Sequence, residues 1–108
     1  EFRLVLFRSN HRLLGIATVV GALALWWLVR RAPVAPATAR LAALGALVAT
    51  LQLTLGVATL LLAVPVSLGV LHQAGAVALL TVAVLLVHSL RPTPVASPVG
   101  SPALATSV

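Results

Sequence analysis

Three long apolar runs constrain the fold of this chain more than any other feature. They cover about residues 11–31, 40–63 and 66–91, and arginine and proline residues separate them. A helix of about 20 apolar residues is long enough to cross the roughly 30 Å hydrocarbon core of a bilayer. The sequence therefore predicts an all-α fold, a polytopic transmembrane helical bundle with three spans.

The composition excludes a soluble domain. Of the 108 residues, 61% are hydrophobic and 7% are charged, whereas soluble domains are normally about 25% charged. The net charge of +6 comes from arginines at the ends of the runs, where they act as topology signals. We therefore expect membrane lipid as the surroundings and no nucleic-acid partner. The absence of cysteine and the single acid, Glu1, exclude thiolate metal sites and catalysis by paired carboxylates.

The two ends of the chain differ from the runs between them, which form a transmembrane domain over residues 10–91. Residues 1–9 (EFRLVLFRS) hold the acid and two of the arginines, and they closely resemble a sequencing-library adapter translated in frame. We interpret them as an artefact and set them aside; the alternative is a natural basic segment beside the membrane. Residues 92–108 are rich in Pro, Ser and Ala, which predicts a disordered tail.

The arginines also predict the orientation of the spans. Arginines gather in the loop near residues 30–40 and at Arg91, whereas the turn at Pro65 has none. By the positive-inside rule, the loop and the tail should face the cytoplasm and the turn should face outward. His11 begins the first span and His72 closely follows the outer turn. Both histidines should therefore lie near the outer face, on helices that run in the same direction.

A histidine pair at one depth of a bundle favours a shared ligand. Two neutral imidazoles that face each other are suited to axial ligation of a haem iron. Zinc would need four ligands, and no cysteine or acid near His11 and His72 supplies the others. The alternative is that each histidine is an interfacial residue without a ligand. We interpret His88 in this second way, because it lies about 24 Å along the helix from His72.

Arg12, Gln52 and several glycines are further candidates for the same pocket. Arg12 follows His11 and would pair with a haem propionate, or would simply extend toward the membrane surface. Gln52 either hydrogen bonds between helices or contacts the cofactor. Gly15 and Gly75 are packing positions that would also leave room for a porphyrin face, as would Gly56. Small residues recur along the second span, which predicts a face for close helix packing.

Three segments resemble the haem A synthase family. HRLLG at residues 11–15 looks like the HR-(I/L)-LG opening of a helix in that family. QLTLGVATLL at residues 52–61 is similar to its Q-x-x-LG-(I/V)-x-TLL segment. Val64-Pro65 followed by HQAGA at residues 72–76 resembles its VP…HQ-(A/S)-G-(A/S) segment. Order and spacing match from about residue 11 to residue 90.

The resemblance implies an architecture and an activity. The family is an eight-span protein of two similar four-helix halves in the bacterial plasma (inner) membrane. This chain resembles three spans of the second, haem-binding half. His11 and His72 are then the axial ligands of the iron of a b-type haem. The implied reaction oxidises a ring methyl of haem O to a formyl group and gives haem A for terminal oxidases.

The resemblance also implies partners. The missing N-terminal half of the same protein binds most of the substrate haem O and holds an acidic residue proposed for catalysis. We therefore expect no catalytic residue in this chain and no activity from it alone. A haem O synthase and an electron donor are further candidate partners. Two alternatives stay open: a b-type cytochrome module for electron transfer, and a cofactor-free membrane assembly protein.

Overall fold

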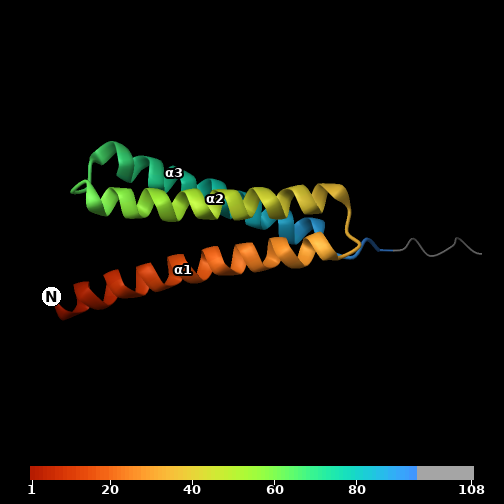
Figure 1. The fold of residues 1–108 in the computed structure, drawn as a ribbon, viewed down its shortest axis with the longest axis horizontal. Coiled ribbons are helices and arrows are strands. Elements are labelled where there is room, and N and C mark those ends of the chain that lie inside the picture. The colour runs from red at the N-terminus through yellow and green to blue at the C-terminus, as the bar shows by residue number, and fades with distance from the viewer. Residues whose placement is uncertain (95–108) are drawn as a thin grey trace, which may run out of the picture.

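The structure, a computed structural model, describes residues 1–94 as three long helices (Figure 1). These are α1 (Phe2–Arg31), α2 (Pro36–Leu61) and α3 (Val66–Ser89), with no strand among the described residues. Each helix is long and apolar enough to cross a membrane. The predicted all-α architecture with three spans is confirmed.

Successive helices run antiparallel, so the molecule has two distinct ends. We call one the histidine end; it holds the start of α1 and the turn between α2 and α3 (Figure 1). The other is the arginine end, with the loop between α1 and α2 and the last turn of α3. The predicted equal depth of His11 and His72 follows from this arrangement.

The first helix is longer than the predicted span. It begins at Phe2 rather than at residue 11, because no proline or glycine interrupts residues 2–10. The origin of residues 1–9 stays a prediction, since any sequence without a helix breaker would continue α1 in this way. Residues 91–94 are irregular. The rest of the predicted disordered tail lies outside the described residues.

The other helices also differ from the predicted spans by a few residues. Helix α2 begins at Pro36 rather than at residue 40, because proline is well suited to the first helical position, where no backbone N–H is needed. It ends at Leu61 rather than at residue 63. Helix α3 begins at Val66 as expected and ends at Ser89 rather than at residue 91, ahead of Pro92.

The core is a narrow band of small side chains on α2. Ala42, Ala46 and Ala49 are 2%, 5% and 1% exposed, and their spacing of four and three residues places them on one helix face. Val29 of α1 and Leu86 of α3 complete a cluster with Ala42. The predicted small-residue face is therefore present, and α2 is the central helix that packs against both neighbours.

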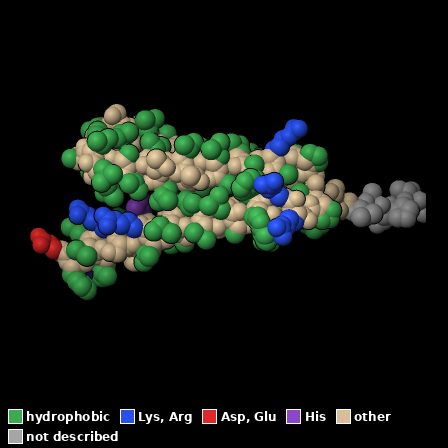
Figure 2. All heavy atoms as spheres, viewed as in Figure 1, with side chains coloured by type: hydrophobic (Ala, Val, Ile, Leu, Met, Phe, Trp, Pro, Cys, Tyr) green, Lys and Arg blue, Asp and Glu red, His purple; other side chains and the backbone are tan. Residues whose placement is uncertain are grey.

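Most large apolar side chains point outward, which suits a lipid environment. Space-filling atoms in Figure 2 show hydrophobic side chains spread along the outside of the bundle. Leu14, Leu61 and Val66 are examples, at 67%, 80% and 82% exposed. Such exposure would favour aggregation in water, whereas in a bilayer these side chains contact acyl chains.

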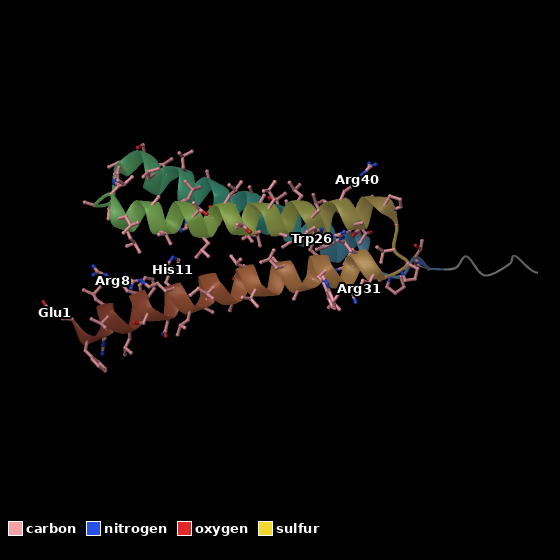
Figure 3. The ribbon with its side chains drawn as sticks, in the orientation of Figure 1. Glu1, Arg8, His11, Trp26, Arg31 and Arg40 are labelled. Atoms are coloured by element: carbon pink, nitrogen blue, oxygen red, sulfur yellow. The ribbon has the colours of Figure 1, made fainter. Side chains whose placement is uncertain are left out.

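Two tryptophans and two arginines close α1 at the arginine end. The guanidinium carbon of Arg30 lies 5.1 Å from the ring centroid of Trp26, and that of Arg31 lies 3.9 Å from the ring of Trp27. Figure 3 shows Trp26 and Arg31 near the last turn of the helix. Aromatic rings with neighbouring arginines are typical of the end of a span at a membrane interface.

A strained turn joins α2 to α3 at the histidine end. Ala63 and Val64 both have φ of 59°, in the left-handed region that residues with a Cβ adopt at a cost of about 1–2 kcal/mol each. The N–H of Val64 donates to the carbonyl of Thr59 at 2.8 Å. Pro65 follows and cannot extend α2, so the chain reverses and α3 starts at once.

This geometry predicts that Ala63→Gly stabilises the protein. Glycine removes the left-handed cost but gains freedom in the unfolded chain, which leaves a net gain of about 0.5–1 kcal/mol. Unfolding in mixed detergent micelles measures the difference. Ala83→Gly, at an exposed position within α3, is the control and should destabilise by about 1 kcal/mol. Equal losses in both variants would contradict the assigned turn.

Candidate functional site

The two predicted histidines meet at the histidine end. His11 belongs to α1 and His72 to α3, and their ring centroids lie 6.2 Å apart with an angle of 84° between the ring planes. In Figure 3, His11 extends from α1 toward the other two helices. The backbones of α1 and α3 are not in close contact anywhere in the described part of the chain. The imidazoles therefore bridge two helices that otherwise pack on α2.

The ring of His72 lies against the backbone of α2 at Gly56. A Cβ placed on Gly56 would lie 3.2 Å from Cε1 of His72, which is tighter than most real contacts of this kind. It would lie at ordinary van der Waals distance from Nδ1 and Nε2, at 3.7 Å and 3.8 Å. Glycine at position 56 therefore makes room for the imidazole. The Nδ1 atom is buried and has no hydrogen-bond partner among the described residues, whereas Nε2 is not one of the buried unpaired atoms. Nε2 is therefore the nitrogen available to a ligand.

Gln52 crosses the same interface in the opposite direction. Its Nε2 donates to the backbone carbonyl of His72 at 2.8 Å, so the expected hydrogen bond between helices is present. The amide lies over Gly75, where an added Cβ would be 2.9 Å from Cδ of Gln52 and closer still to Oε1. The Oε1 atom is buried without a partner.

Gln52, Gly56, His72 and Gly75 form one packing unit, which we call the Gln52–His72 unit. Helix α2 contributes Gln52 and Gly56, four residues apart, and α3 contributes His72 and Gly75, three residues apart. Each helix supplies one polar side chain and the glycine that accommodates the side chain of the other. The unit sets both the distance between the helices and the direction of the His72 ring.

The other candidates are more open. Gly15 is half-buried, and an added Cβ there would have no atom of another helix within 4 Å among the described residues, so it is not a close-packing position. Arg12 is exposed, and Figure 2 shows arginine side chains beside the histidine at this end. His88 lies at the arginine end, in a shallow groove with Val87 and Arg91, away from the histidine pair. The sequence predicts Gly56 as a packing position or as room for a porphyrin face, whereas in the structure it makes room for the ring of His72.

The donor set is restricted to imidazole. Among the described residues, no group of three or more His, Cys, Asp or Glu side chains is close enough to hold a metal ion. The site therefore lacks the four protein ligands of structural zinc and the three of catalytic zinc. The side chains that meet at the histidine end and carry ligand-type nitrogen atoms are the two imidazoles of His11 and His72.

Comparison with known proteins identifies the family. The model of the COX15-CtaA family, described as cytochrome oxidase assembly protein, matches residues 3–84. Haem A synthase COX15 of Arabidopsis thaliana is 46% identical over 86 residues, which are 79% of this chain and 19% of the relative. The human haem A synthase COX15 is 43% identical over 86 residues, again 79% of this chain and 21% of the relative.

A bacterial relative shows the same similarity. Haem A synthase of Caulobacter vibrioides is 49% identical over 75 residues, which are 68% of this chain and 22% of the relative. The chain thus spans about a fifth of the length of the curated relatives that it matches. No solved structure matches the chain. With three spans and this similarity, the chain is a multi-pass membrane protein and belongs to the haem A synthase family.

Proposed function

We propose that this chain is part of a haem A synthase and that His11 and His72 are the axial ligands of a b-type haem. The observation that carries the proposal is the separation of the two rings. Metal–imidazole bonds are about 2 Å long and a ring centroid lies about 1 Å beyond its nitrogen, so two axial imidazoles place their centroids about 6 Å apart. The observed separation is 6.2 Å.

The surroundings of His72 fit a ligand of this kind. Gly56 lies against the Cε1 edge of the ring, so packing on α2 positions the imidazole before any cofactor binds. The buried Nδ1 faces the protein, and Nε2 is then the nitrogen for the iron. When bound, a haem with two imidazole ligands supplies one-electron transfer. The role of this chain is to hold the macrocycle between α1 and α3 and to provide the side chains that surround it.

The spacing of arginines supports an orientation in the membrane. Four arginines lie at the arginine end: Arg30, Arg31, Arg40 and Arg91. The histidine end has one, Arg12, when residues 1–9 are set aside, and three when they are counted. By the positive-inside rule the arginine end faces the cytoplasm, and the histidine pair lies near the outer face of a bacterial plasma membrane. Arg12 is then placed to bind a haem propionate.

The activity belongs to the complete protein. Relatives named haem A synthase are about five times longer than the matched segment, and this chain carries no carboxylate inside its spans. The oxidation of a ring methyl of haem O to a formyl group therefore needs the N-terminal half, which completes the substrate site. A haem O synthase that delivers the substrate and an electron donor are further partners in this proposal.

Replacement of either histidine tests the proposal. In the full-length protein that contains this chain, His11→Ala and His72→Ala should each abolish the six-coordinate low-spin absorption spectrum of this haem, because one axial bond is lost. His88→Ala is the matched control and should leave the spectrum unchanged. A low-spin spectrum that survives the double replacement of His11 and His72 would refute the assignment.

The same site predicts a role for Gly56. In Gly56→Ala the new methyl would displace the imidazole of His72 by a few tenths of an ångström. Overpacking of this size costs about 1 kcal/mol, or about fivefold in haem affinity. Titration of the full-length apoprotein with haem measures the change. Gly69→Ala, one turn before His72 with open space around the added methyl, should bind haem like the wild type; equal losses would argue against a seat at Gly56.

A further inference from the structure

Two buried polar atoms stand out because neither has a hydrogen-bond partner. They are Oε1 of Gln52 and Nδ1 of His72, and among the described residues these are the buried side-chain nitrogen and oxygen atoms left unpaired. An unpaired buried polar atom costs about 1–3 kcal/mol. Both atoms belong to side chains of the Gln52–His72 unit, in which the amide of Gln52 donates a hydrogen bond to the backbone carbonyl of His72.

The two atoms are chemically complementary. If Nε2 of His72 binds a metal, the neutral imidazole carries its proton on Nδ1 and becomes a donor there. An amide oxygen is an acceptor only. The amide orientation is fixed, because a flipped Gln52 would place its oxygen against the carbonyl oxygen of His72 instead of a donor. Oε1 of Gln52 is therefore the amide atom that is free to accept a hydrogen bond from the ring of His72.

We propose that Gln52 is the positioning residue for His72 and that its Oε1 accepts the Nδ1–H of the metal-bound imidazole, directly or through one buried water. The inference rests on the proposed function, since it assigns the partner of the ligand. A ligating histidine normally donates its second N–H to an acceptor, which fixes the tautomer and raises the basicity of the ligand. Gly75 is required because a side chain there would displace the amide.

A more basic imidazole stabilises ferric iron over ferrous iron. Removal of the acceptor in Gln52→Leu should therefore raise the reduction potential of this haem while the low-spin spectrum persists. A tenfold change in the ratio of ferric to ferrous affinity corresponds to about 59 mV for a one-electron couple, and we expect a shift of this order. Redox titration of the haem-loaded, full-length protein measures the shift.

Two further variants separate positioning from simple helix packing. Gln52→Glu keeps an acceptor oxygen in either protonation state, so its potential should return to the wild-type value or fall below it. Gly75→Ala leaves Gln52 in the sequence but displaces its amide, so its potential should rise as in Gln52→Leu. If Gln52→Leu fails to bind haem, the reduction potential of Gly75→Ala tests the same inference. Gln73→Leu, at an exposed neighbour of His72, is the matched control and should not shift the potential.

The outcomes distinguish this inference from the proposed function. If Gln52→Leu and Gly75→Ala keep the wild-type potential and the low-spin spectrum, Gln52 only joins two helices and the inference is wrong, while the histidine ligands stand. If Gln52→Glu shifts the potential upward like Gln52→Leu, the acceptor role is also wrong. A full-length wild-type protein without a low-spin haem at this site would overturn both.

Discussion

The close approach of α2 and α3 at two glycines is the contact on which the site depends. In lipid, apolar side chains gain little from burial against each other, so helix pairs are specified by small residues and a few polar contacts. Here Gly56 accepts the ring of His72 and Gly75 accepts the amide of Gln52. A methyl group at either glycine would move one of these polar side chains. The hydrogen bond from Gln52 to the carbonyl of His72 then fixes the register of the two helices.

Helix α1 is held differently, and this difference shapes the histidine end. Its buried contact is Val29, which packs with Ala42 and Leu86 near the arginine end. The buried apolar side chains of the described residues all lie between that end and the middle of the bundle. At the histidine end, α1 reaches α3 through the pair of imidazoles. The position of His11 therefore depends on a buried contact about 27 Å further along the same helix.

The sequence predicts the broad features because each depends on local patterns. Apolar runs determine three helices, Pro33, Pro36 and Pro65 place the turns, and alternating direction brings His11 and His72 to one end. The contacts within the site depend on how each helix is rotated about its axis. Because these helices are apolar on every face, their sequence pattern does not predict that rotation. For this reason the seat of His72 at Gly56 and the open surroundings of Gly15 emerged only from the structure. The left-handed turn at residues 63–64 was also hidden, since Ala and Val rarely adopt it.

The uneven packing of the bundle bears on what the site is for. A protein that needed only stability would continue the small-residue face of α2 to both ends, yet beyond Ala49 that face turns to Gln52 and Gly56. Gln52 and Gly56 hold the imidazole of His72 in place where an apolar contact would otherwise stabilise the helix pair. Two polar atoms are buried there without partners. Such local departures from good packing are expected where a site is maintained for function. A flat macrocycle held between His11 and His72 would supply the contacts that α1 and α3 lack at this end, so cofactor binding and helix association would stabilise each other.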